Sequence, residues 1–335
     1  MLDSIKIKLP MESLIDINLN HFEKTYHTAS ENGEEVIKQK ECFLMKEFLP
    51  FGVNNLILKE CNYNQKIIVE TSAKILKEDY HDLIHKNNIL KLLANLNTSS
   101  ISFKESDFLN SQILKLHVTN NLKVERNPQE YLDALYNYRV NHNYYVNHYK
   151  TGISFTRNVR TKHLRDRISF YLKFYEMQKD REMLRYVSPM IFKEEIRVES
   201  NLNHFYQMRK YLKIPQSYNG IKLCDALKSD SRVNFEMLNN ITANYKFKLA
   251  EEQEHQDLSL AQLEKRVGRE QIIEQFNYDM QLIMKYIRSK LGKNTKPSRY
   301  YKEYEKLLIE MISTNQNENI NCISLIDELK FKLAE

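Results

Sequence analysis

The chain has 335 residues, of which 42% are hydrophobic and 28% are charged, and its formal net charge is +6 at pH 7. This composition excludes a largely disordered protein, and the length predicts two domains, or one large domain with a helical extension. No run of about 18 apolar residues occurs, and the N-terminus alternates charged and apolar residues. We therefore expect no membrane-spanning helix, no secretory signal and a cytoplasmic protein.

Glycine and cysteine usage excludes several classes of site. The chain has only six glycines, and neither GxGxxG nor GxxxxGK occurs, which argues against Rossmann dinucleotide folds and Walker nucleotide-binding proteins. The four cysteines form no CxxC pair, so we expect neither a structural zinc site nor a disulfide framework.

The order of the predicted elements favours an α+β fold. Runs rich in Ile, Val, Phe and Tyr predict strands at residues 4–9, 66–71, 112–119, 151–156, 168–176 and 192–200. Helical spacing of apolar residues predicts helices at 79–96 and 128–138, and long helical stripes follow at 258–290 and 299–312. We predict a mostly antiparallel sheet with helices over residues 1–215 and a helical C-terminal domain over residues 216–335, which could bind DNA.

The segment from residue 151 to 176 has the composition of a phosphodiester-cleaving site. In a strand over 168–176, Tyr171, Lys173 and Tyr175 would share one face. The connection before it, residues 157–167, holds five formal positive charges and one negative charge, which suits phosphate contacts. A tyrosine hydroxyl attacks phosphorus only when its proton is removed or its charge is stabilised, which a lysine and a metal ion can do.

Two further strands place charged groups on one face. The strand at 192–200 would align Lys193, Glu195, Arg197 and Glu199, whose carboxylates suit a divalent cation. The strand at 112–119 would place His117 on a face with Lys115, and an imidazole can bind a metal or accept a proton.

Each of these patterns also has a structural interpretation. Tyrosine is abundant, with 21 in the chain, so Tyr171 could be a packing residue with no catalytic role. Alternating Lys and Glu on a strand also occurs on solvated sheet faces, and a solitary histidine such as His117 is often structural. The aromatic residues of the segment 141–149 could stack on single-stranded bases or pack in the core.

Six short segments occur in the order and at the spacing of a known family. They are Met1-Leu2-Asp3 with Leu9-Pro10, Val69-Glu70-Thr71-Ser72-Ala73-Lys74-Ile75-Leu76, Lys115-Leu116-His117-Val118-Thr119, Tyr171-Leu172-Lys173 with Glu176, Glu195-Ile196-Arg197-Val198-Glu199, and Tyr211-Leu212-Lys213. Together they resemble the rolling-circle replication initiators of filamentous phages and related plasmids, the gene II/X type. The resemblance covers residues 1–215 and departs from the family at His117, where the family has an acidic residue.

This resemblance implies a Rep-like catalytic sheet and a metal-dependent DNA endonuclease that nicks and rejoins single-stranded DNA at a phage or plasmid origin. Tyr171 would form a 5′-phosphotyrosyl link, aided by Lys173 and by Mg²⁺ or Mn²⁺. Host helicase and polymerase would be partners, besides origin DNA. The expected metal ligands are His117, Glu195, Glu199, Glu176 and Glu70, and the expected DNA contacts are Arg157, Arg160, Lys162, Arg165, Arg167, Lys115 and Arg197.

Two other functions remain open at this point. A non-catalytic DNA-binding regulator of replication or transcription would need only the basic character and the C-terminal helices. An RNA-binding protein would use the tyrosine-rich segment for stacking.

Overall fold

The chain folds as two compact units. The computed structural model describes residues 1–31, 34–61, 64–137, 144–159, 165–214, 220–229, 232–242, 260–276, 279–290, 297–314 and 316–334. One unit comprises Met1–Asn244 with Asp327–Glu335, and the other comprises Tyr245–Ile326. The division falls later than the predicted boundary after residue 215, because α7 (Val233–Thr242) packs on the sheet of the first unit.

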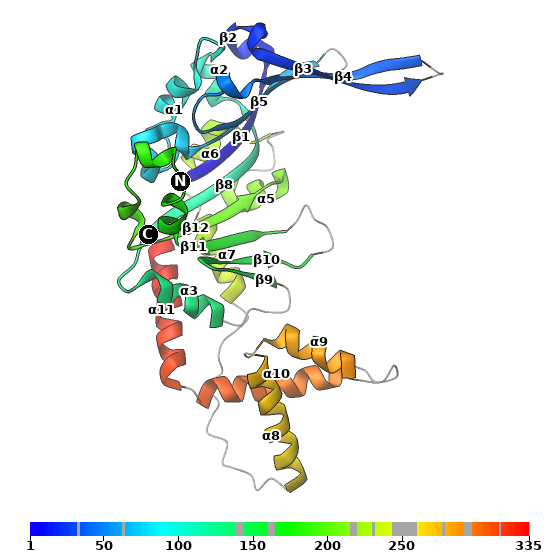
Figure 1. Cartoon of the computed structure of the whole chain (residues 1–335), viewed down its shortest axis with the longest axis vertical. Helices are drawn as coiled ribbons and strands as arrows, with labels where there is room; N and C mark the ends of the chain where they lie inside the picture. Colours follow the sequence, from blue (N-terminus) through cyan, green and yellow to red (C-terminus); the bar gives the residue numbers. More distant parts are fainter. Residues whose placement is uncertain are drawn as a thin grey trace. The chain divides into compact units, whose positions relative to one another are not determined.

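A ten-stranded sheet forms the first unit, and every neighbouring pair in it is antiparallel (Figure 1). The strand order is β3-β4-β5-β6-β1-β8-β12-β11-β10-β9. A separate pair joins β2 (Leu14–Ile17) to β7 (Ile101–Phe103). The strands of the large sheet are β1 (Leu2–Pro10), β3 (Phe22–Glu31), β4 (Glu34–Leu44), β5 (Val53–Cys61), β6 (Asn64–Ser72), β8 (Gln112–Lys123), β9 (Tyr144–Tyr149), β10 (Gly152–Arg157), β11 (Arg167–Tyr171) and β12 (Glu195–Leu202). The predicted α+β class is confirmed.

The two faces of the sheet differ in polarity. In β1, Ile5 and Ile7 are fully buried on one face, whereas Lys6 lies on the other and pairs with Glu70 of β6. The apolar face is covered by α7, which packs on β8, β11 and β12. The opposite face is therefore the polar one, and we call it the polar face from here on.

Short helices complete the first unit. They are α1 (Ile89–Leu96), α2 (Glu105–Leu109), α3 (Pro128–Asn137), α4 (Lys173–Met177), α5 (Phe205–Leu212) and α6 (Leu223–Lys228), together with 3₁₀ segments that include Ala73–Asp82 and Pro189–Phe192. Among the residues that the structure describes, no helix has both the length and the apolar character that crossing a bilayer requires.

Helices alone form the described part of the second unit. They are α8 (Leu260–Gln275), α9 (Met280–Lys290), α10 (Pro297–Thr314) and the first part of α11 (Gln316–Ala334). Ile273, Ile283, Ile287 and Leu308 are among the buried side chains of its core. The helical character predicted for the C-terminal region is confirmed.

Several element boundaries differ from those predicted. The strand predicted at 168–176 ends at Tyr171, where the amide of Leu172 donates to the carbonyl of Thr151 and α4 begins. The helix predicted at 79–96 is replaced by a 3₁₀ segment and α1, because Leu83, with a φ of 58°, interrupts helical geometry between them.

The start of β12 also moves, from residue 192 to Glu195. Ser188 caps the 3₁₀ turn Pro189–Phe192 by accepting a hydrogen bond from the amide of Met190 over 3.3 Å. Lys193 therefore precedes the strand. The prediction that it shares a strand face with Glu195 is wrong. The strands β2, β3, β4, β5, β7 and β9 were not predicted.

Candidate functional site on the polar face of the sheet

Tyr171 ends β11 on the polar face, in a row that contains Arg197 of β12 and Gly152 of β10. Its hydroxyl donates to Oε2 of Glu199 over 3.1 Å, and Oε1 of the same carboxylate lies 3.1 Å from Nδ1 of His117 on β8. The adjacent strands β8, β12 and β11 thus bring an imidazole, a carboxylate and a phenol into one hydrogen-bonded chain.

Burial and nearby charges control the ionisation of Tyr171 and Glu199. Burial raises the pKa of the Tyr171 hydroxyl well above its usual value, and the negative charge of Glu199 raises it further. Burial is also the largest influence on Glu199 and opposes its ionisation, but the hydrogen bond and charge of His117, the hydrogen bond from Tyr171 and the charge of Arg197 together outweigh it and lower the pKa of the carboxyl. The resting phenol is therefore neutral beside an ionised carboxylate, and it needs positive charge close to its oxygen before it can ionise.

Buried polar atoms without hydrogen-bond partners surround this chain. Within the part of the protein that the structure describes, they include Nε2 of His117, Oγ1 of Thr119, Oγ of Ser154, Nη2 of Arg197 and Oδ1 of Asn201. Strand register places all five residues on the polar face, at positions paired with one another or with the rows of Tyr171 and Glu199. Buried polar groups are normally satisfied, so this cluster has unused capacity to bind a polar ligand or ordered water.

Arg197 lies beneath this surface and is fully buried. Its guanidinium donates to Asp3 over 3.1 Å, to the hydroxyl of Tyr80 over 2.7 Å and to Oδ1 of Asn121 over 2.8 Å. The prediction that Arg197 contacts DNA is corrected, because the side chain has no solvent-exposed surface and its guanidinium pairs with Asp3. Its positive charge instead lowers the pKa of the Tyr171 hydroxyl, against the larger effects of burial and of Glu199.

Lys173 lies near Tyr171, but not on a shared strand face as predicted. It is the first residue of α4, and its Nζ lies 5.9 Å from the centre of the Tyr171 ring. The side chain is only 3% exposed and bonds Glu176 over 2.5 Å. Burial, with repulsion from Arg197, lowers the pKa of its ammonium group. Tyr175, predicted on the same strand face, is an exposed residue of α4.

The structure brings together two of the five predicted metal ligands. His117 and Glu199 are in contact, whereas Glu195 bonds His81 over 2.9 Å, Glu70 pairs with Lys6 over 3.0 Å and Glu176 pairs with Lys173. The described residues contain no cluster of three or more His, Cys, Asp or Glu side chains placed to hold a metal. The predicted five-residue shell is therefore not formed.

Of the remaining pair, only Glu199 is placed to bind an ion beside Tyr171. Mg²⁺ commonly binds one or two carboxylates, several waters and the phosphates of its substrate. Glu199 supplies a carboxylate, whereas His117 turns Nδ1 toward that carboxylate, so its buried Nε2, which has no partner among the described residues, points away from Glu199.

The basic connection between β10 and β11 is only partly described. Arg160 and Lys162 lie outside the described residues. Arg157 lies 3.8 Å from Asp166, Arg165 donates to the carbonyl of Val159 over 3.4 Å, and Arg167 is exposed at the start of β11. Of the other predicted DNA contacts, Lys115 lies on the polar face, partly exposed, 3.7 Å from Glu70.

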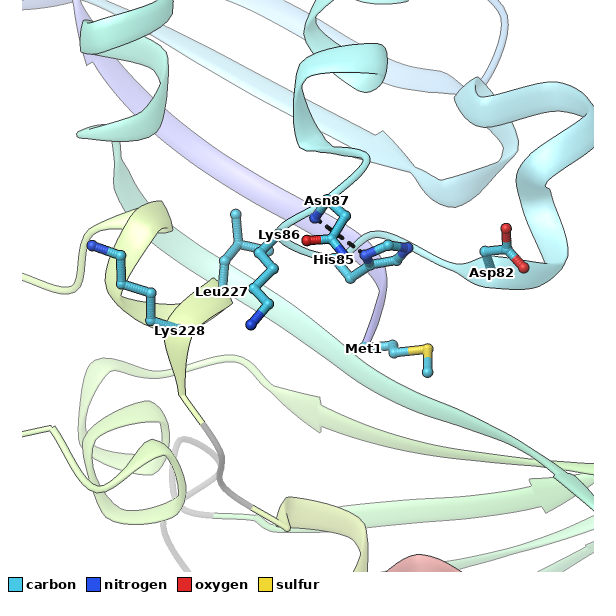
Figure 2. A pocket seen from close by; sticks show the side chains of 7 residues that line it. All are labelled: Met1, Asp82, His85, Lys86, Asn87, Leu227 and Lys228. Atoms are coloured by element: carbon cyan, nitrogen blue, oxygen red, sulfur yellow. Dashed lines mark hydrogen bonds between the residues drawn. The ribbon is translucent and has the colours of Figure 1, made fainter. Parts of the chain in front are cut away.

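An open cavity of about 380 Å³ lies near the start of β1. Figure 2 shows the residues that line it, which are Met1, Asp82, His85, Lys86, Asn87, Leu227 and Lys228. Inside it the amide of Asn87 donates to Nδ1 of His85 over 3.2 Å. None of the predicted catalytic, metal-binding or DNA-binding residues lines this cavity, so it is separate from the Tyr171 cluster.

Sequence reasoning assigned no role to Asp3, Tyr80, His81 or Asn121, which hold Arg197 and Glu195 in place. Asp3 was part of a matching segment, but its contact with Arg197 requires β1 and β12 to flank β8, an order that periodicity does not specify.

No protein-family model matches this chain, and neither a curated protein nor a solved structure matches it.

Proposed function

We propose that this protein is a rolling-circle replication initiator whose Tyr171 nicks and rejoins single-stranded DNA. The observation that carries the proposal is the hydrogen-bonded chain from Tyr171 through Glu199 to His117, on a polar sheet face with unpaired buried polar atoms. The resemblance of six ordered segments to the gene II/X initiators supports it independently.

The reaction is a transesterification. The Tyr171 oxygen attacks phosphorus, its proton passes to Glu199, the new phosphotyrosyl bond forms and the bond from phosphorus to the 3′ oxygen breaks. The departing 3′ oxygen takes up a proton and becomes a free hydroxyl. Because one phosphoester replaces another, the reverse attack by a 3′ hydroxyl rejoins the strand without a nucleotide cofactor.

Charged residues of the chain have separate roles in this step. His117 keeps Glu199 ionised and oriented toward the phenol. Lys173 and Arg197 place positive charge near the ring as negative charge develops on the phenol oxygen and the phosphoryl group. The raised pKa of Tyr171 and the lowered pKa of Glu199 oppose proton transfer in the resting protein, so the step requires a further cation at the phenol oxygen.

A divalent cation, Mg²⁺ or Mn²⁺, would be held by the Glu199 carboxylate, by waters and by the phosphate of the DNA, with Nδ1 of His117 orienting that carboxylate. It would supply the positive charge that polarises the phosphoryl oxygen and favours the phenolate. The partly exposed Lys115 and the exposed Arg167 would contact the DNA backbone.

The test is a nicking assay on supercoiled plasmid that carries the origin of the replicon encoding this chain, with Mg²⁺ or with a chelator. Tyr171→Phe should abolish both nicking and the covalent protein–DNA adduct, and should leave binding to the origin within a few fold. Tyr175→Phe is the matched control, because Tyr175 lies nearby in sequence but is 45% exposed on α4. Normal nicking by Tyr171→Phe would exclude Tyr171 as the nucleophile.

A second outcome would favour another class of function. If the wild-type protein binds the origin but neither nicks it nor forms an adduct under any divalent ion, a non-catalytic DNA-binding regulator explains the data better.

A further inference from the structure

The edge strand β9 displays tyrosines on the same face as Tyr171. Alternate residues of a strand share a face, so Tyr145, Asn147 and Tyr149 point to one side. Register pairs Tyr149 with Gly152 and Gly152 with Tyr171, which places all three in one row on the polar face. The rings of Tyr145 and Tyr149 are unusually accessible for aromatic groups, with 45% and 56% of the residues exposed.

The residue between Tyr149 and Tyr171 has no side chain. Two steps of about 4.8 Å across the sheet separate the backbones of these tyrosines, or about 10 Å. Gly152 stands at the middle position, so no side chain in this row rises between the two rings. In this row, therefore, no side chain separates a ligand lying on Tyr149 from the Tyr171 ring.

Positive charge borders these rings. The cations of β9, β10, β11 and the β9–β10 turn are Lys150, Arg157 and Arg167, of which Arg157 lies 3.8 Å from Asp166. Lys150 is exposed immediately after Tyr149, and exposed Arg167 lies in the row of Thr156 and Tyr145. Accessible aromatic rings with the exposed cations Lys150 and Arg167 near them suit a polyanion that carries flat apolar groups.

We propose that Tyr145 and Tyr149 form a stacking platform for the bases of single-stranded DNA, with Lys150 and Arg167 contacting its phosphates. Single-stranded nucleic acid has this combination of charge and exposed base faces, whereas a duplex hides its base faces by pairing and stacking. The proposal rests on the proposed function for the choice of DNA and for the direction of the strand toward Tyr171.

The spacing of the rings sets the length of the bound segment. Four residues along a strand span about 13 Å, and a stacked strand advances about 3.4 Å per nucleotide. Bases on Tyr145 and Tyr149 are therefore separated by about four nucleotides if the bases between them stay stacked, or by fewer if the strand is extended. The base on Tyr149 lies next to the phosphate that Tyr171 would attack.

The test measures binding of a fluorescein-labelled oligothymidylate to the full chain by anisotropy, with a chelator present so that nicking cannot contribute. Base stacking on an aromatic ring corresponds to a loss of about 5- to 150-fold in affinity on substitution by alanine. Tyr145→Ala and Tyr149→Ala should each weaken binding within this range. Tyr145→Phe and Tyr149→Phe should bind like the wild type, because phenylalanine preserves the stacking face.

Tyr206→Ala is the matched control. Tyr206 is 66% exposed but lies on α5, a helix that packs against α7 on the apolar side of the sheet, so this variant should bind normally. All three alanine variants should melt at the wild-type temperature, because exposed rings contribute little to stability.

Two results would overturn the platform: wild-type binding by both alanine variants of β9, or equal losses in the Phe and Ala variants, which would indicate a hydroxyl contact. Tighter binding of oligouridylate than of oligothymidylate would overturn the assignment to DNA. Failure of Tyr171 to form an adduct, with the stacking pattern intact, would refute the proposed function and leave the platform in place.

Discussion

Gly152→Ala tests whether Tyr171 is held as closely to β10 as the structure indicates. A Cβ at position 152 would lie 2.7 Å from the carbonyl oxygen of Phe170 and 2.7 Å from Cβ of Tyr171. Both atoms are fixed to the backbone of β11, so neither can move away without a shift of that strand. Gly152→Ala should therefore displace Tyr171 relative to Glu199.

The size of the effect follows from two opposing contributions. Forcing a methyl group into a packed position costs about 1–3 kcal/mol. Replacing glycine also restricts the unfolded chain, which stabilises the folded state by about 0.4–1 kcal/mol. We expect a net loss of about 1–2 kcal/mol in the free energy of unfolding, measured by urea denaturation, together with reduced adduct formation in the nicking assay.

Gly268→Ala provides the contrast. Gly268 lies within α8. Apart from its chain neighbours and the nearby backbone of the helix itself, no described atom lies within 4 Å of a Cβ built at this position. Alanine should stabilise that helix by about 0.5–1 kcal/mol, since glycine is unfavourable in a helix interior. If Gly152→Ala were as stable as the wild type and formed the adduct at the wild-type rate, the argument that this glycine permits the approach of Tyr171 would be wrong.

Two further predictions concern charged pairs. Asp3→Asn should lower the free energy of unfolding by about 3 kcal/mol, because it leaves the fully buried Arg197 without its carboxylate. Glu70→Gln, which breaks a partly exposed pair with Lys6, should lower it by less than about 1 kcal/mol. Similar losses for the two variants in urea denaturation would contradict this account. The hydrogen bond to Glu195 raises the pKa of His81 above its value in the unfolded chain. The His81–Glu195 pair therefore stabilises the fold fully below about pH 6.5, and this stabilisation is lost as pH rises through the folded pKa. His81→Gln should reduce the fall in melting temperature above pH 6.5, and an unchanged slope would count against the pair.

The sequence allowed prediction of those parts of the fold whose side-chain pattern is local. Alternation in β1, the β-branched run in β6 and helical stripes in α9 and α10 predicted these elements correctly, because each is a local pattern that burial imposes on the chain. The strands β3, β4 and β9 were missed since their polar and aromatic residues show no clear apolar alternation.

The candidate site shows the same limit. Tyr171, Glu199 and His117 were named from their positions in strands, and the structure places them in contact. Glu195 has the same alternation as Glu199 but bonds His81, which comes from a 3₁₀ segment far away in the sequence. Strand periodicity identifies the face on which a side chain lies, but it does not identify the loop that folds over that face.

The course of the chain between the two units bears on the order of folding during synthesis. Glu328 accepts a hydrogen bond from the amide of Glu125 over 3.2 Å and another from the Tyr131 hydroxyl, while Leu329 and Leu333 are buried. These residues belong to the first unit but leave the ribosome only after the whole of Tyr245–Ile326. The nascent sheet unit must therefore wait for the helical unit to be translated before its last core side chains arrive.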